Sequence, residues 1–310
     1  MVIGNMNDLI TNIKNLELET IKNLRNSKST NTLRAYQSDY NDFYLFCSKN
    51  GFQAMPTQPK ILALYLTHLA SYSKYSTLKR RLASISILHK AKGHYIDVKH
   101  PIIMENLMGI KRTLGSNQKG KKPLIINDLK LLIKAIDESK EKNIRKIRDK
   151  ALVLVGFSGG FRRSELVNIE YEDVEFVREG VKIFVKRSKT DQSGEGMTKA
   201  IPYFENENFC PVKFLNKWIL EAELKNGKIF DISDKSVALI IKKYASYAGL
   251  DANRYAGHSL RSGFATSTAE SGAEERNIMA MTGHKSTEMV RRYIKEANLF
   301  KNNALNKIKL

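Results

Sequence analysis

Apolar side chains recur at the three- and four-residue spacing of amphipathic helices through residues 29–112. The first predicted helix follows Ser29, reads TLRAYQSDYNDFYLFC, and stops at Gly51. A second begins near Pro59, and a third covers the basic stretch STLKRRLASISILHK. A fourth, IIMENLMGIKRTL, follows Pro101. This part of the chain is therefore expected to form an all-α domain of four or five short helices with basic faces.

The pattern changes after residue 112. Residues 113–123, TLGSNQKGKKP, have the composition of a linker. A helix is then predicted at IINDLKLLIKAID, with Asn127 or Asp128 as its N-cap, and a buried one at RDKALVLVGFSGG. Another helix is predicted to begin at RRSELVNIEYEDV. VKIFVKRSK and MTKAIPYF alternate like two strands joined by the turn TDQSGEG, and the chain from residue 211 is again mostly helical.

These elements predict a mainly α chain with a small antiparallel β-sheet, in the α+β class. The expected division is an all-α domain over residues 1–112, a basic linker over 113–123 and a larger domain over 124–310. A chain of 310 residues is long enough for two such domains.

Charge points to a polyanionic partner. The chain has 52 Lys and Arg against 32 Asp and Glu, a formal net charge of +20. Residues 1–122 hold 19 of these basic residues and only 7 of the acidic ones. Such an excess favours nucleic acid as the partner. The candidate DNA contacts are Arg34, Lys74, Lys79, Arg80 and Arg81 in the first domain, and Lys119, Lys121 and Lys122 in the linker.

Several other classes of protein are disfavoured. The two cysteines, Cys47 and Cys210, give neither a disulfide framework nor a zinc spacing. The N-terminus does not read as a signal peptide, and the longest apolar run, ALVLVGF, is far too short to span a bilayer. We therefore expect a cytoplasmic protein, associated with nucleoid DNA, that has no metal, no cofactor and no membrane partner.

Three short segments contain side chains suited to binding a phosphate. In GFSGGFRRSEL, a glycine pair precedes Arg162 at a helix start, and Glu165 lies three residues on, where it can orient that guanidinium. In GHSLRSGFATS, His258 and Arg261 share a helical face. In MTGHKSTEMVRRYIK, a helix ends before His284, and Tyr293 follows in the next helix. Taken alone, each segment also suits an ordinary surface pair or a core tyrosine.

Their ordered combination is more specific. Arg162, Lys189, His258, Arg261, His284 and Tyr293 form the series R…K…H-x-x-R…H…Y. Over roughly residues 29–297 the chain resembles the tyrosine recombinases, the group that includes phage integrases, the Xer resolvases and the Cre recombinase. FRRSEL matches the motif of the first arginine, with Arg163 as the near alternative to Arg162. KRSKT matches the hairpin lysine, with Lys186 as the alternative to Lys189.

The resemblance implies a core-type DNA-binding domain at residues 1–112 and a tyrosine-recombinase catalytic domain at 124–310. It further implies that Tyr293 attacks the scissile phosphate and forms a 3′-phosphotyrosine, leaving a 5′-hydroxyl. Arg162 and Arg261 would bind the non-bridging oxygens. The proton for the leaving oxygen would come from Lys189, His258 would assist proton removal from Tyr293, and His284 would hydrogen-bond the phosphoryl group.

The same resemblance implies the partners. These are double-stranded DNA with paired recombination sites, a homotetramer assembled on that DNA, and, in some systems, accessory DNA-bending proteins. Residues 298–310 would form an oligomerisation helix whose apolar face docks on a neighbouring protomer, and the alternatives are a helix packed on its own domain or a frayed tail. The apolar residues of this stretch are Leu299, Phe300, Leu305 and Ile308.

Other readings explain less of the sequence. GSNQKGKK resembles a P-loop but ends in Lys122 and lies in a linker. A type IB topoisomerase would use similar phosphate chemistry, and a non-catalytic DNA-binding relative would share the fold. The complete set of polar residues argues against a non-catalytic relative, and a purely electrostatic binder would leave the ordered motifs unexplained.

Overall fold

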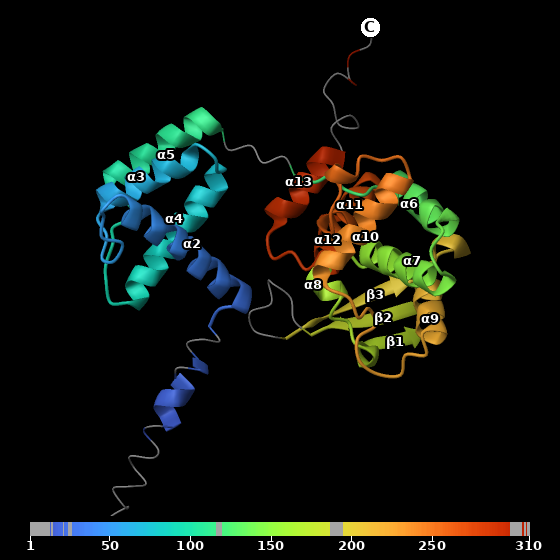
Figure 1. Cartoon of the computed structure of the whole chain (residues 1–310). Coiled ribbons are helices and arrows are strands. Elements are labelled where there is room, and N and C mark those ends of the chain that lie inside the picture. Colours follow the sequence, from blue (N-terminus) through green and yellow to red (C-terminus); the bar gives the residue numbers. More distant parts are fainter. Residues whose placement is uncertain are drawn as a thin grey trace, which may run out of the picture. The chain divides into compact units, whose positions relative to one another are not determined.

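The computed structural model describes residues 13, 15–20, 22–23, 27–115, 120–186, 195–297, 306 and 308. The chain divides into two compact units, residues 1–119 and residues 120–310 (Figure 1). Each unit has its own buried apolar core, so each is described by itself.

The first unit is built from helices. Helix α2 packs on α4, and α3 packs on both α4 and α5 (Figure 1). Phe43, Tyr65 and Leu78 are among the fully buried side chains between them. The Ser29 hydroxyl accepts a hydrogen bond from the Thr32 amide and so caps α2 at its predicted start. The helices are α2 (Thr30–Lys49), α3 (Pro59–Ala70), α4 (Tyr75–Ala91) and α5 (Pro101–Leu114).

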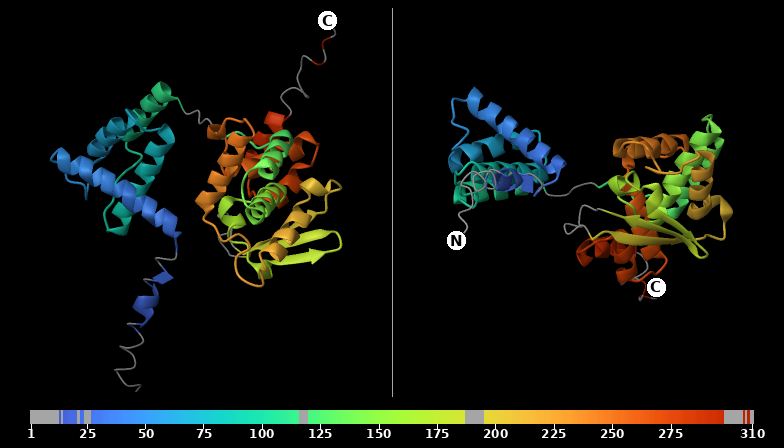
Figure 2. Two further views of the ribbon diagram at one scale, coloured as in Figure 1. Left: turned by 45° about the vertical axis from the view of Figure 1, so that its right-hand side comes forward. Right: turned by 90° about the horizontal axis from the view of Figure 1, so that it is seen from below.

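The second unit is organised around α7. This helix runs between α6, α9 and α11, and from Ala151 to Ser158 every residue is buried (Figure 1 and Figure 2). Helix α11 in turn packs on α12 and α13. The helices are α6 (Ile126–Glu138), α7 (Asn143–Ser158), α8 (Arg163–Leu166), α9 (Pro211–Glu221), α10 (Asp234–Tyr247), α11 (His258–Glu270), α12 (Glu275–Thr282) and α13 (Thr287–Ala297).

A three-stranded antiparallel sheet completes this unit. Its strands are β1 (Val174–Val177), β2 (Gly180–Val185) and β3 (Met197–Pro202), in the order β1-β2-β3. Strands β2 and β3 alternate between buried and exposed side chains, as expected for a sheet with one covered face. The buried face includes Lys199, which pairs in register with the buried Ile183. The predicted hairpin is confirmed, and the mainly α fold with a small sheet is confirmed with it.

Two local predictions are wrong. The helix expected from RRSELVNIEYEDV ends at Leu166, and Val174 already belongs to strand β1. Val167 and Ile169 are both buried, so the segment follows the two-residue period of extended chain after one helical turn. Neither Asn127 nor Asp128 caps α6, because the Asp128 carboxylate instead accepts hydrogen bonds from Lys122 and Tyr255.

Candidate active site

The turn between α7 and α8 requires glycine. Gly160 has a φ of 55°, a conformation that side chains with a Cβ rarely adopt. A Cβ at this position would lie 3.0 Å from the ring of Phe264 and 3.2 Å from the Thr282 methyl group. The close approach lets this turn pack directly on α11 and on the end of α12.

Arg162 follows this turn as the N-cap of α8. The Glu165 carboxylate accepts a hydrogen bond from the Arg162 backbone amide at 2.9 Å and a second from the Arg162 guanidinium. Glu165 is buried, so its charge is balanced locally by the arginine. The acidic side chain therefore fixes the direction of the guanidinium.

Helix α11 supplies His258 in its first turn and Arg261 three residues later. The Arg261 side chain is only 1% exposed, and its Nη1 donates to the Gly160 carbonyl at 3.0 Å. Its Nη2 is buried and has no hydrogen-bond partner among the residues that the structure describes. Burial, followed by the positive charge of Arg162, lowers the pKa of Arg261 to about 10. The two guanidinium groups are thus close enough for their charges to repel.

His258 lies in the same positive environment. The residue is exposed to solvent, although the protein around the ring still reduces its hydration. That desolvation, followed by the charges of Arg261 and Arg162, lowers the pKa of His258. This shift favours the neutral imidazole, which is the form that can accept a proton.

The end of α12 and helix α13 supply the last two residues, His284 and Tyr293. Gly283 ends α12 in the left-handed conformation, with a φ of 63°, as the sequence predicts. The next residue, His284, has its Nδ1 2.7 Å from the Thr282 hydroxyl. Its ring centroid lies 6.3 Å from that of Tyr293, which is 8% exposed. Burial and the nearby arginines lower the pKa of His284 to about 4.

Five of the six predicted catalytic side chains thus come together from three separate stretches of sequence. The sixth, Lys189, lies outside the described residues. Its alternative, Lys186, forms ion pairs with Glu170 and Asp173, and these hydrogen bonds raise its pKa. Lys186, just after β2, thus pairs with the segment that precedes β1 and keeps about half of its side chain exposed.

A lysine that the sequence analysis did not single out lies beside the cluster. Lys199 of β3 is fully buried and donates hydrogen bonds to the carbonyl groups of Gly159 and Met281. The alternating pattern of MTKAIPYF places it on the same face as Met197 and Ile201. A lysine on the inward face of a strand is the signal that would have identified it.

The predicted DNA contacts occupy different environments. Arg34, Lys74 and Lys79 are exposed on the first unit. Arg80 is about half exposed and pairs with Asp39. Of the linker lysines, Lys119 lies outside the described residues. The other two bind their own unit, Lys121 at the Asn253 carbonyl and Lys122 at the Asp128 carboxylate.

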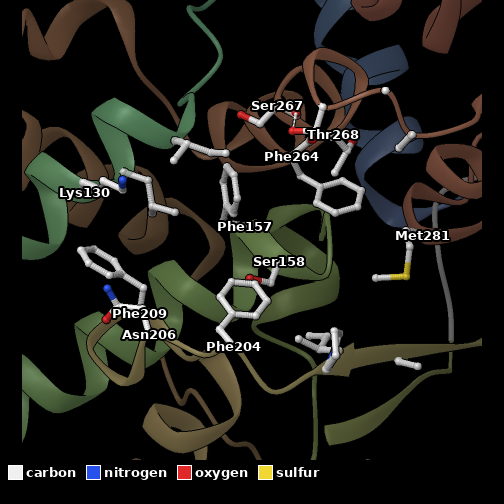
Figure 3. A pocket seen from close by; sticks show the side chains of 18 residues that line it. Lys130, Phe157, Ser158, Phe204, Asn206, Phe209, Phe264, Ser267, Thr268 and Met281 are labelled. Carbon is white, nitrogen blue, oxygen red and sulfur yellow. Dashed lines mark hydrogen bonds between the residues drawn. The ribbon is translucent and has the colours of Figure 1, made fainter. Parts of the chain in front are cut away.

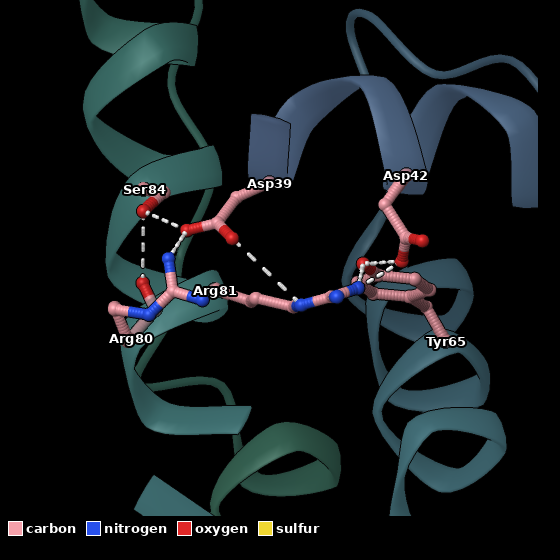
Figure 4. A network of polar contacts seen from close by, with 6 residues as sticks. All are labelled: Asp39, Asp42, Tyr65, Arg80, Arg81 and Ser84. Atoms are coloured by element: carbon pink, nitrogen blue, oxygen red, sulfur yellow. Dashed lines mark hydrogen bonds and ion pairs between the residues drawn. The ribbon is translucent and has the colours of Figure 1, made fainter. Parts of the chain in front are cut away.

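Arg81 belongs to a network inside the first unit. Figure 4 shows its side chain lying between Asp39 and Asp42, where it also donates to the Tyr65 hydroxyl at 2.7 Å. Ser84 donates to the same Asp39 carboxylate. The Arg81 side chain is 17% exposed, so this arginine joins α2, α3 and α4 to one another. The structure gives it an internal partner in place of the surface position that the sequence analysis expected.

The second unit also contains an apolar cavity of about 760 Å³ (Figure 3). Phe157, Phe204, Phe209 and Phe264 line it, and among the described residues Lys130 is its one charged lining residue. None of the five described candidate catalytic residues lines this space. The cavity therefore has the chemistry of a site for apolar side chains, distinct from the cationic cluster.

The described residues contain neither a candidate metal site nor a candidate membrane span. Nowhere among them do three or more His, Cys, Asp and Glu side chains gather in a way that could hold a metal ion. No described helix is both long and apolar enough to cross a membrane.

Comparisons with known proteins agree with this geometry. The model of the phage integrase family matches residues 124–299. The integrase/recombinase XerD homolog of Selenomonas ruminantium is 42% identical, over 97% of this chain and 92% of that protein.

Among solved structures, the XerH recombinase bound to a palindromic difH substrate, in a post-cleavage complex, has a TM-score of 0.67 at 18% identity. The match covers 87% of this chain and 80% of that one. A lambda integrase tetramer bound to a Holliday junction has a TM-score of 0.59 at 17% identity, covering 91% and 75%. The chain belongs to the phage integrase family, the tyrosine recombinases, whose members cut and rejoin DNA.

Proposed function

We propose that Tyr293 is the nucleophile of a site-specific recombination reaction on double-stranded DNA. The observation that carries the proposal is the convergence of a tyrosine, two arginines and two histidines. The charges of Arg162 and Tyr293 both act on Arg261, and those of Arg261 and His258 act on His284. An anion is the ligand that such a cluster favours.

The two arginines would stabilise the transferring phosphoryl group. Arg162 and Arg261 repel one another in the free protein, and a phosphodiester between them would relieve that repulsion. Negative charge builds on the non-bridging oxygens during phosphoryl transfer, so fixed guanidinium donors stabilise the transition state. A metal ion is not needed for this role.

The proton transfers follow from the same residues. The phenol oxygen of Tyr293 attacks phosphorus while the bond to the 5′-oxygen breaks. His258 accepts the phenolic proton, a role that its lowered pKa supports by favouring the neutral form. His284 hydrogen-bonds the phosphoryl group. In the proposal Lys189 donates the proton that the leaving 5′-oxygen requires. The product is a 3′-phosphotyrosine that keeps the phosphodiester energy, so religation by the 5′-hydroxyl requires no ATP.

A covalent-trapping assay tests the nucleophile. Protein is incubated in EDTA with nicked DNA fragments from either side of its own gene, and products are separated on a denaturing gel. We expect a DNA-linked band that Tyr293→Phe lacks and that Tyr247→Phe, at an exposed tyrosine on α10, retains. An adduct of equal intensity with Tyr293→Phe would refute the assignment. Binding without any adduct would favour a non-catalytic DNA-binding relative.

A second assay separates recombination from topoisomerase activity. Plasmids carrying one copy or two copies of the trapped site are compared with a plasmid that has none. A recombinase exchanges strands only between paired sites, whereas relaxation of all three plasmids would indicate a type IB topoisomerase.

We also propose that four copies assemble on DNA, with residues 298–310 of each copy docking on a neighbour. Most of this stretch lies outside the described residues, but its sequence supplies Leu299, Phe300, Leu305 and Ile308. The apolar cavity offers a matching site in the second unit. Exposed Arg34, Lys74 and Lys79 would contact DNA phosphates. Accessory DNA-bending proteins and a cytoplasmic, nucleoid-associated location complete the proposal.

A further inference from the structure

Two turns that are far apart in the sequence meet beside the candidate active site. One is the Gly159–Gly160 turn that leads to Arg162, and the other is the end of α12 that leads to His284. The turns are in close contact, since a Cβ at Gly160 would lie 3.2 Å from the Thr282 methyl group. Phosphate-binding groups on either side therefore depend on how these turns are held together.

Lys199 bonds to both turns. Its Nζ donates to the Gly159 carbonyl at 2.7 Å and also to the Met281 carbonyl. The neighbouring carbonyl, that of Gly160, accepts the hydrogen bond from Arg261, and the residue after Met281 is Thr282, whose hydroxyl contacts His284. One ammonium group thus lies between the backbone segments that fix Arg261 and His284.

The Lys199 side chain is enclosed by the second unit. Lys199 is fully buried, and its Nζ lies 4.6 Å from the centroid of the Phe161 ring in addition to its two carbonyl partners. Its contacts with described residues are thus all inside this unit. Lys199 acts on the phosphate pocket through the backbone of the two turns.

We infer that Lys199 is a positioning residue that holds the Arg162 turn and the His284 turn in the geometry needed for cleavage. The inference rests on the proposed function, because it assumes that Arg261, His284 and Tyr293 act on one phosphate.

The electrostatic environment suggests that Lys199 is retained for this geometry at a cost to stability. Burial lowers its pKa to about 7, Glu165 favours the charged form, and Arg261 and Arg162 disfavour it. The positive charge of Lys199 in turn helps to lower the pKa of His284. An apolar side chain of similar length would avoid the desolvation cost. Lys199→Met avoids this cost but leaves the Gly159 and Met281 carbonyl groups without this donor, so we expect it to fold with only a small change in thermal stability.

The first test separates DNA binding from the chemical step. With nicked DNA at saturating concentration, Lys199→Met should form the covalent adduct about 10 to 100 times more slowly than the parent protein. Its dissociation constant for DNA should stay within about threefold. Lys199→Arg, which keeps a cation with several donors, should recover part of the rate. Lys182→Met, at an exposed lysine on the neighbouring strand β2, is the matched control and should leave the rate unchanged.

A modified substrate distinguishes positioning from proton donation. When sulfur replaces the bridging 5′-oxygen, the leaving thiolate has a conjugate acid with a pKa of about 8.5 and needs no proton. The defect of Lys199→Met should persist on this substrate, whereas that of Lys189→Met should largely disappear. Restoration of the Lys199→Met rate would overturn the inference by making Lys199 a proton donor. An unchanged rate on ordinary DNA would overturn it as well.

A measurement without DNA tests the positioning role of Lys199 separately from the proposed recombinase function. Amide hydrogen exchange of residues 282–285 should be faster in Lys199→Met than in the parent protein, while exchange in α9 should be the same. This result does not depend on whether Tyr293 forms an adduct. If Lys199→Met does not fold, Lys199→Gln, whose shorter side chain can reach only one carbonyl, should show the same faster exchange. Unchanged exchange in the folded variant would contradict the positioning role.

Discussion

At the scale of single residues, Arg261 combines a buried positive charge with incomplete hydrogen bonding. It is almost fully buried, its Nη1 is bonded to Gly160, and its Nη2 has no partner among the described residues. A buried donor left unpaired typically costs about 1–3 kcal/mol. A phosphate oxygen would satisfy this donor, so the same atom that destabilises the free protein favours the substrate.

Replacing Arg261 tests that argument. Arg261→Lys keeps a positive charge but loses the planar group that can bond Gly160 and a phosphate oxygen together. We expect adduct formation at saturating DNA to fall by about 100- to 1000-fold, the usual effect of losing one oxyanion donor. The thermal midpoint should change little. Single-turnover trapping measures the rate, and a loss below about tenfold would show that the fork geometry is unimportant.

The lowered pKa of His284 predicts a pH dependence of stability. In the folded protein this pKa is about 4, whereas the ordinary value is 6.5. Between these values the unfolded chain binds a proton that the folded protein does not, so stability rises with pH. The contribution is fully present above about pH 6.5 and is lost as the pH falls toward 4. Urea unfolding at pH 7 and pH 4.5 should show a smaller difference for His284→Asn than for the parent protein.

The sequence predicted the catalytic cluster better than its supporting residues. Arg162, His258, Arg261, His284 and Tyr293 lie in recognisable motifs, and the structure brings them together, although their roles are still proposals. Lys199 was missed because a lysine is normally read as a surface residue, and only the partner strand shows that its face is covered. The same limit explains why Arg81 was predicted to lie on the surface, since nothing in STLKRRLASIS shows which of its basic residues faces Asp39.

At the scale of secondary structure, periodicity was informative where an element was long. The helices from α2 to α5 and the β2–β3 hairpin were all predicted, because their apolar positions repeat over several turns or pairs. Helix α8 and strand β1 each have only four residues, too few for a period to be resolved. The predicted Asp128 cap of α6 failed because its carboxylate accepts hydrogen bonds from Lys122 and from Tyr255, which is distant in sequence.

The polar network of the first unit gives a prediction at this scale. Asp39 of α2 is buried and bonds Arg80 and Ser84 of α4. Asp39→Asn would leave Arg81 without one of its two carboxylate neighbours, and breaking a buried pair typically costs about 3–5 kcal/mol. We expect a loss near the lower bound, about 3 kcal/mol, because Asp42 remains.

Amide exchange in α4 measures this loss without interference from the second unit. Exchange there should speed up in Asp39→Asn, while α7 and α9 should be unaffected. Glu175→Gln, which removes an exposed partner of Lys182 on the sheet, should change stability by less than about 1 kcal/mol. An equal effect of the two substitutions would mean that burial of the Asp39 network is unimportant.

At the scale of the whole molecule, the first unit carries the denser positive charge, and the described candidate catalytic residues lie in the second unit. Residues 1–119 hold 17 basic against 7 acidic residues. DNA binding by a basic surface releases counterions, so affinity falls steeply with salt. Substitution of Lys74 or Lys79 should therefore weaken DNA binding. Substitution of Arg261 or Lys199 should instead slow cleavage.

Assembly into a tetramer provides the last prediction, because cleavage and strand exchange need different numbers of protomers. Ala273 is an exposed residue at the edge of the apolar cavity, and Ala273→Trp would fill part of that space. If residues 298–310 of a neighbour dock there, the variant should still bind a single site and form the Tyr293 adduct on nicked DNA. Recombination between two sites should fall by at least about tenfold, a loss that corresponds to roughly 1.4 kcal/mol of docking energy. Leu220→Trp, on the exposed face of α9, should recombine normally. Normal recombination by Ala273→Trp would instead mean that the C-terminal stretch docks elsewhere or packs on its own domain.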